Sequence, residues 1–152
     1  MMISQEWETP DNFFELLDAE FHFDIDVCAT ASNTKCFEYY SIEDNGLMQP
    51  WQGVCWMNPP YKSVGAWTNK AYSAAKNGAT VVGLLRASID TKWWHAYIMR
   101  AQEIRFIADR LWFKLNGISQ RANHPSVIVI WEPGLPCGEM RVRSITNGRR
   151  GA

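Results

Sequence analysis

The sequence of 152 residues lacks the patterns of several protein classes. It contains no apolar run near the roughly 18 residues of a membrane span, and its acidic start lacks the basic residues of a secretory signal. Repeats and low-complexity segments are absent as well, which leaves little room for long disorder. These absences predict a cytoplasmic protein without membrane contact. The length favours one domain over residues 1–152.

Cysteine patterns typical of metal sites are also missing. The four cysteines contain no Cys-x-x-Cys pair, so neither a zinc site nor a disulfide framework has support, and we expect no metal. Free cysteines are usually buried. We therefore expect reduced and mostly buried thiols at Cys28, Cys36, Cys55 and Cys137.

Charge is distributed unevenly along the chain, although the net charge is only −1. Residues 1–55 hold eleven acidic side chains against Lys35 alone, whereas residues 62–121 hold ten basic and three acidic ones. Basic side chains on one face could contact the phosphates of a nucleic acid. Both runs could equally be solvated faces, and the sequence leaves the two readings open.

Strand and helix patterns alternate through the chain. Helices are expected within residues 8–21, 64–77 and 90–102, with Thr9, Ser63 and Asp90 as caps and Pro10 in the first turn. Period-2 or continuous apolar runs predict strands at 21–29, 53–57, 80–88, 103–109, 110–115 and 126–131. This alternation favours an α/β fold with a mostly parallel sheet flanked by helices.

The stretch WMNPPYKS places a rigid polar corner directly after a predicted strand. A residue before proline is kept out of the helical region, so Asn58 and Pro59 are held extended, and the two prolines bring no N–H donors. The Asn58 side-chain oxygen and the Pro59 carbonyl could each accept one N–H of a nucleobase amine, which leaves its lone pair facing an electrophile. Tyr61 offers a ring on which a flipped base could stack.

This corner and the motifs around it resemble the short phage and prophage Dam-type DNA N6-adenine methyltransferases. The similarity covers most of residues 7–131 and includes WETP, FDIDVCA, NGLMQPW, WMNPPY and LLRASIDTKWW. The resemblance implies a Rossmann-like methyltransferase fold and methyl transfer from S-adenosylmethionine, with S-adenosylhomocysteine as product, to adenine N6 in double-stranded DNA. It further implies a phage-encoded enzyme that protects DNA from restriction.

The resemblance also implies site residues. The catalytic motif corresponds to Asn58, Pro59, Pro60 and Tyr61, and the cofactor motifs to Trp7, Thr9, Pro10, Asp26, Val27, Cys28 and Ala29. The glycine-rich loop that many methyltransferases carry after the first strand is replaced here by DVCATASN.

Further cofactor contacts are suggested by chemistry. Asp26 could accept hydrogen bonds from a ribose or an amino group, or could be a polar residue on an exposed strand face. Asn33 or Lys35 could reach the carboxylate of the cofactor. Asp44 could contact its adenine, although the Asp-Asn-Gly sequence equally suits a turn.

Candidate DNA contacts lie in the basic part of the chain. Lys62, Arg86, Lys92 and Trp93 could touch DNA, or the latter three could serve packing and surface charge. Residues 112–124 are expected to form a target-recognition loop, with Lys114 and Arg121 among its donors, or else a plain mobile loop. Residues 141–152 are expected to be a flexible basic tail. His124 is expected to be structural.

Other functions and assemblies remain open from the sequence alone. The acceptor geometry of the corner also suits methylation of an RNA base or of a protein glutamine. The missing glycine-rich loop leaves room for a catalytically inactive nucleic-acid-binding module. The assembly could be a monomer or a homodimer.

Overall fold

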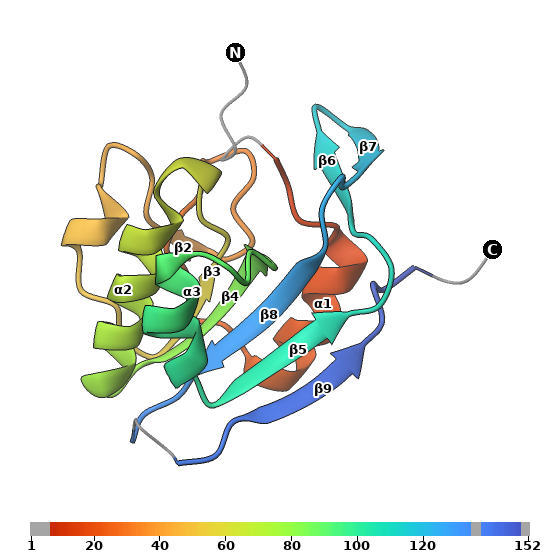
Figure 1. Ribbon diagram of the computed structural model, residues 1–152. Helices are drawn as coiled ribbons and strands as arrows, with labels where there is room; N and C mark the ends of the chain where they lie inside the picture. The colour runs from red at the N-terminus through yellow and green to blue at the C-terminus, as the bar shows by residue number, and fades with distance from the viewer. Residues whose placement is uncertain (1–6, 135–137, 150–152) are drawn as a thin grey trace.

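The computed structural model of the chain describes residues 7–134 and 138–149 (Figure 1). A seven-stranded sheet in the order β2-β1-β3-β4-β8-β5-β9 forms its centre, and a separate hairpin pairs β6 with β7. The sheet strands are β1 (Ile25–Asp26), β2 (Glu38–Tyr39), β3 (Val54–Met57), β4 (Thr80–Arg86), β5 (Glu103–Ile107), β8 (Ser126–Trp131) and β9 (Arg141–Ile145). The hairpin strands are β6 (Trp112–Leu115) and β7 (Ile118–Arg121).

Helices cover both faces of the sheet, with α1 on one side and α2 and α3 on the other (Figure 1). Their bounds are α1 (Asp11–Phe21), α2 (Val64–Lys76) and α3 (Lys92–Tyr97), joined by the 3₁₀ turns η2 (Gly46–Met48), η3 (Tyr61–Ser63) and η4 (Ile98–Arg100). The predicted α/β class is therefore confirmed.

The sheet is mostly parallel, as predicted. β2, β1, β3 and β4 run parallel to one another, β8 is antiparallel to both β4 and β5, and β9 is parallel to β5. β1 pairs with β2 on one side and with β3 on the other, so the direction of strand addition reverses at β1. Such a reversal opens a crevice beyond the carboxyl ends of the two central strands, here β1 and β3.

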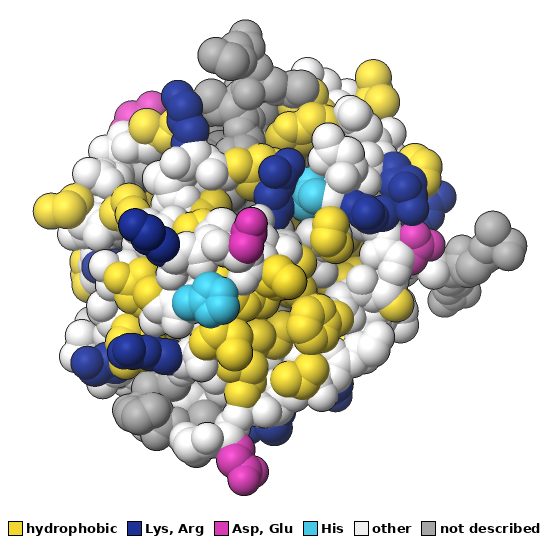
Figure 2. Space-filling view, viewed as in Figure 1, with side chains coloured by type: hydrophobic (Ala, Val, Ile, Leu, Met, Phe, Trp, Pro, Cys, Tyr) yellow, Lys and Arg dark blue, Asp and Glu magenta, His cyan; other side chains and the backbone are white. Residues whose placement is uncertain are grey.

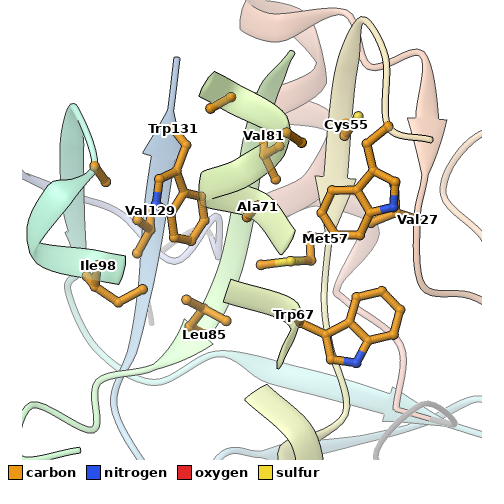
Figure 3. Close-up of a cluster of buried hydrophobic side chains, with 14 of the residues drawn as sticks. Val27, Cys55, Met57, Trp67, Ala71, Val81, Leu85, Ile98, Val129 and Trp131 are labelled. Atoms are coloured by element: carbon orange, nitrogen blue, oxygen red, sulfur yellow. The ribbon is translucent and has the colours of Figure 1, made fainter. Parts of the chain in front are cut away.

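Strand side chains alternate between two apolar clusters. Val81 and Leu85 of β4 belong to the cluster under α2 and α3, whereas Val82 and Leu84 belong to the cluster under α1. Figure 3 shows the first cluster, in which Trp67 and the other apolar residues of α2 face the sheet. The buried residues of α2 recur at helical spacing, which explains why this helix was predictable: Val64, Trp67, Thr68, Ala71, Ala74 and Ala75.

Two predicted elements are shorter than expected. The strand predicted at 21–29 is regular only at Ile25–Asp26, because the Asp26 carboxylate accepts the Cys28 backbone N–H and curls the chain. The helix predicted at 90–102 is regular only from Lys92 to Tyr97. Its cap is not Asp90 but Thr91, whose hydroxyl accepts the Trp94 N–H.

The first helix is also capped differently from the prediction. Pro10 occupies the N-cap position, and no side chain caps the helix. Thr9 therefore does not act as the cap, and its side chain is free to bond elsewhere. Ser63 does occupy the N-cap position of α2, but it makes no side-chain capping bond because η3 leads directly into the helix.

The segments predicted as a loop and a tail are both ordered strands. Residues 112–124 form the β6–β7 hairpin and the short connection to β8, since main-chain pairing joins Trp112 through Leu115 to the facing strand. From residue 141 the chain forms β9, whose Arg141 and Arg143 bind the buried carboxylate of Glu103. Composition alone does not reveal these partners, which lie far away in sequence. Residues 150–152 lie outside the described residues.

The cysteines agree with the prediction where they can be seen. Cys28 and Cys55 are buried, Cys36 is half-buried, and all three are free thiols. Cys137 lies outside the described residues. Within residues 7–134 and 138–149 there is no cluster of three or more potential metal-ligating side chains, and no helix is long and apolar enough to cross a bilayer.

Candidate active site

The polar corner predicted from the sequence lies at the carboxyl end of β3. Asn58 directly follows the last residue of that strand, and Pro60 is extended with φ −65° and ψ 145°. The Asn58 amide nitrogen donates to the Thr9 hydroxyl oxygen at 3.1 Å, and Thr9 is only 2% exposed. In this arrangement the Nδ2 atom faces Thr9 and the Oδ1 atom points away from it. The Asn58 Oδ1 atom, which receives no hydrogen bond from the described residues, is left as an acceptor.

A narrow cleft beside Asn58 brings most of the predicted cofactor residues together. Its lining comes from the segment before α1, the end of β1, the turn after β1 and the end of β3. The residues are Trp7, Thr9, Asp26, Cys28, Asn33, Lys35, Trp56 and Asn58. The crevice expected beyond the carboxyl ends of β1 and β3 is thus present, and it contains the candidate catalytic residue Asn58.

Asp26 is the buried acid of this cleft. It is 3% exposed, and its two carboxylate oxygens accept the backbone N–H groups of Cys28 at 3.3 Å and Lys35 at 3.0 Å. Burial raises the pKa of Asp26 to about 7, and the two backbone bonds only partly oppose this. The reading of Asp26 as a residue on an exposed strand face is therefore wrong.

Lys35 and Asn33 take part in the local structure of the same turn. The Lys35 ammonium bonds to Glu8 at 3.3 Å and to Asp11 at 2.7 Å, so its charge is already paired. The Asn33 side-chain oxygen accepts the Thr30 backbone N–H at 2.7 Å. These contacts hold the DVCATASN turn, which has no glycine, in place beside the cleft.

A second cleft meets the first at Cys28, which lines both. It runs along the end of β2 and η2 to Pro60, and it combines aromatic and hydroxyl groups: Tyr40, Ser41, Ile42, Asn45, Gly46, Leu47, Ser63 and Trp67. Gly46 is required here, since a β-carbon at this position would lie 2.3 Å from the Val27 carbonyl oxygen.

Four predicted cofactor residues do not line either cleft. Val27 and Ala29 are buried in the interior, and Pro10 lines a different cleft beside Trp112. Asp44 is exposed and accepts the N–H and the hydroxyl of Ser41, so it acts as a turn former.

Tyr61 faces a third pocket on the other side of the corner. Its lining comes from the segment before α1, the end of β4, the hairpin and the β7–β8 connection: Trp7, Tyr61, Arg86, Phe113, Gln120, Arg121, Ala122, Asn123 and His124. The Arg86 guanidinium lies 4.5 Å from the centre of the Tyr61 ring. Trp7 lines this pocket and the first cleft, so it separates the two.

The remaining predicted DNA contacts are spread over the surface. Lys62 and Lys92 are exposed, and Trp93 is half-buried against the core. Lys114 pairs with Asp11 at 3.3 Å, and Arg121 with Asp109 at 3.3 Å. Figure 2 shows Lys and Arg side chains beside a histidine in the upper part of one face, near the hairpin, whereas the lower centre of that face is apolar.

Sequence reasoning missed two residues of the site. Trp56 is fully buried, yet it lines the first cleft, and its indole N–H has no partner among the described residues. The sequence signal that could have identified Trp56 is its position two residues before Asn58. At this position its side chain lies on the opposite face of the sheet from those of Cys55 and Met57. His124 was considered structural, but it bonds to Tyr61 at 3.2 Å.

A family model and several proteins of similar sequence all carry the names of methyltransferases. The family model described as DNA N-6-adenine-methyltransferase (Dam) matches residues 2–149. A DNA N-6-adenine-methyltransferase of Haemophilus phage HP1 is 35% identical over 89% of this chain and 83% of its own length. A protein of the same name from Escherichia phage T1 is 29% identical over 73% of this chain and 48% of its own length. A putative methyltransferase, YfdM of Escherichia coli K12, is 36% identical over 39% of this chain and 74% of its own.

Proposed function

Because the chain belongs to the DNA N-6-adenine-methyltransferase (Dam) family and is an adenine-specific DNA methyltransferase, we propose that Asn58 and Pro59 carry its chemistry. The observation that supports this most is the hydrogen bond from the Asn58 amide to Thr9. It anchors the Asn58 side chain with its oxygen turned away from Thr9, at the carboxyl ends of β1 and β3.

In this mechanism the chain acts on the amine of adenine by accepting its two N–H groups. The Asn58 side-chain oxygen takes one, and the Pro59 carbonyl takes the other. The amine nitrogen then becomes more tetrahedral, and its lone pair is withdrawn from the ring and available for methylation. The methylated nitrogen then releases one of its two protons to solvent. The groups are in place before the reaction, so little reorganisation is needed as charge develops.

The methyl donor we propose is S-adenosylmethionine, which supplies an electrophilic methyl group on a sulfonium and leaves S-adenosylhomocysteine. The residues present fit such a group. The first cleft offers the buried Asp26 carboxylate and the unpartnered Trp56 indole N–H. The second cleft, joined to it at Cys28, offers the aromatic and aliphatic walls that an adenosine needs. The amino-acid end would lie beside Asp26 and the adenosine between β2 and Pro60.

The fold we propose is Rossmann-like. Its support is the parallel series β2-β1-β3-β4 with helices on both faces and the clefts at the carboxyl ends of β1 and β3. All of residues 1–152 would then form one methyltransferase domain. The absence of the glycine-rich loop is compensated by the turn that Asp26, Thr30 and Asn33 hold together.

The DNA would approach the Tyr61 pocket. An enzyme that acts on a base in a duplex must first extract it, and Tyr61 would receive the extruded adenine by stacking. Arg86 and Arg121 line the same pocket and would contact the phosphates, with Lys62, Lys92, Trp93 and Lys114 farther out. The β6–β7 hairpin, whose strand β7 is exposed throughout, would read the sequence.

The cellular role we propose is the one that phage relatives suggest. The enzyme would act in the cytoplasm of the host, as a monomer or homodimer, and would protect DNA from restriction. The family assignment does not favour an RNA or glutamine substrate, nor an inactive binding module.

The test is methylation of DNA by the purified protein. Incubation with S-adenosylmethionine and unmethylated plasmid DNA should yield N6-methyladenine, measured after digestion to nucleosides. Asn58→Ala should abolish the product and leave the thermal midpoint nearly unchanged. Asn69→Ala, which alters an exposed asparagine on α2, is the matched control and should retain full activity. Full activity of Asn58→Ala would refute the mechanism.

A further inference from the structure

Residues outside the Asn-Pro-Pro-Tyr corner hold the Tyr61 side chain. His124 meets its ring edge-on, with centroids 5.3 Å apart and planes at 88°, and the Tyr61 hydroxyl lies 3.2 Å from His124 Nε2. The Arg86 guanidinium covers the ring at 4.5 Å. Tyr61 nevertheless remains 39% exposed, so part of its ring stays available to a ligand.

The hydrogen bonds around His124 define which group donates. His124 Nδ1 lies 3.0 Å from the side-chain oxygen of Asn123, and an amide oxygen only accepts, so Nδ1 carries the proton. Burial, with the nearby charges of Arg86 and Arg110, lowers the pKa of His124 to about 4, and the imidazole is neutral. Nε2 therefore accepts. Burial also raises the pKa of Tyr61, although the charge of Arg86 and its hydrogen bond to the hydroxyl act in the opposite direction. The hydroxyl therefore keeps its proton and can donate a hydrogen bond to Nε2.

Asn123 and His124 belong to the connection between β7 and β8. Phe113 of β6 lies beside the His124 ring, with centroids 6.4 Å apart. Phe113 of the hairpin and Tyr61 of the Asn-Pro-Pro-Tyr corner are thus linked through the neutral His124 ring.

We propose that His124, oriented by Asn123, is a positioning residue that sets the Tyr61 ring for the extrahelical adenine by accepting its hydroxyl hydrogen bond. Arg86 closes one side of the ring, and the base stacks on what remains. This inference rests on the proposed function. His124 does not touch the reacting atoms and transfers no proton. It acts on the Tyr61 side chain through the hydroxyl hydrogen bond and the edge-on ring contact.

Such a role predicts which kinetic constant changes. The affinity for DNA comes mainly from phosphate contacts, which His124 does not make, so KM for DNA should stay nearly constant. A misplaced ring orients the base less often, so kcat should fall. Loss of one neutral hydrogen bond corresponds to about a fivefold decrease.

The experiment is a double-mutant cycle of Tyr61→Phe and His124→Ala, assayed with unmethylated plasmid DNA. Tyr61→Phe should lower kcat about fivefold, and His124→Ala, which also removes the edge-on ring contact, at least fivefold. The double variant should lose clearly less than the product of the two single losses, because both remove the bond between these side chains. His124→Gln, which keeps an acceptor near the place of Nε2, should recover most of the activity. His95→Ala, at an exposed histidine on α3, is the matched control and should leave kcat unchanged.

Two results would overturn the inference. Additive losses, about 25-fold in the double variant, would mean that His124 acts independently of the hydroxyl. A rise in KM for DNA with constant kcat would make His124 a DNA contact instead. Both results require a wild-type protein that methylates DNA, so a failure of the proposed function, seen as no product at all, is distinguishable.

Discussion

Thr9→Val tests whether the orientation of the Asn58 amide matters for the reaction. The change keeps the shape of a side chain that is 2% exposed, and it removes the oxygen that accepts from Asn58 at 3.1 Å. A hydrogen bond of this kind contributes about 1 kcal/mol net. Without it the amide can turn over. The ratio of the productive to the reversed orientation should fall about fivefold, since 1.4 kcal/mol corresponds to roughly tenfold, and the productive fraction should therefore fall about twofold.

The assay is single-turnover methylation with enzyme in excess over unmethylated DNA, which isolates methyl transfer from product release. Thr9→Val should lower this rate about twofold, and Thr9→Ser, which keeps the hydroxyl, should restore it. Thr68→Val is the matched control: Thr68 is fully buried in α2 and donates to the Val64 carbonyl at 3.0 Å, so it should lose stability and keep its rate. A wild-type rate in Thr9→Val, with the fold intact, would refute the reasoning.

Three further predictions follow from buried polar groups. Because burial raises the pKa of Asp26 to about 7, the folded protein keeps a proton there that the unfolded chain has released. The contribution of this group to the free energy of unfolding should therefore fall as the pH rises from about 4 to 7, by up to roughly 1.4 kcal/mol per pH unit. In urea unfolding, Asp26→Asn should lack this pH dependence, and the same pH dependence in wild type and variant would contradict the prediction. Trp56→Phe removes the unpartnered indole N–H and should weaken S-adenosylmethionine binding about fivefold by calorimetry, whereas an unchanged Kd would exclude Trp56 as a donor. Glu103→Gln should destabilise the fold by about 2 kcal/mol in thermal unfolding, because Arg105 and the arginines of β9 lose a buried charged partner. Its kcat should stay constant, and an unchanged stability would show that these ion pairs contribute little.

Much of the fold was accessible from the sequence because the buried elements carry strong patterns. β4 and β8 are continuous apolar runs, and α2 repeats its buried residues at helical spacing. The backbone of the Asn-Pro-Pro-Tyr corner was equally predictable, since prolines restrict the backbone by themselves. Asp26, Asn58 and Arg86 lie at strand ends, as expected.

The parts that were not predictable depend on partners far away in sequence. The sequence of β9 resembles a basic tail, because its ion-pair partner Glu103 lies far away in the chain. β7 is exposed at every residue, so its sequence has no hydrophobic pattern that would predict a strand. The position of Thr9 before the first helix predicts a helix cap, but its hydroxyl instead accepts a hydrogen bond from the side chain of Asn58, 49 positions later. His124 could be connected to Tyr61 only once β8 had placed the two segments side by side.

The main-chain pair between Glu8 and Lys114 has a consequence for how such enzymes can diversify. The Glu8 N–H donates to the Lys114 carbonyl at 2.7 Å, and the Lys114 N–H returns a bond at 2.9 Å, so no side chain is involved. Ordinary substitutions on the hairpin leave these bonds intact, and only a proline at either position would remove a donor. If the hairpin reads the target sequence, as proposed, its outer surface can acquire new preferences while the main chain beside Thr9 stays anchored.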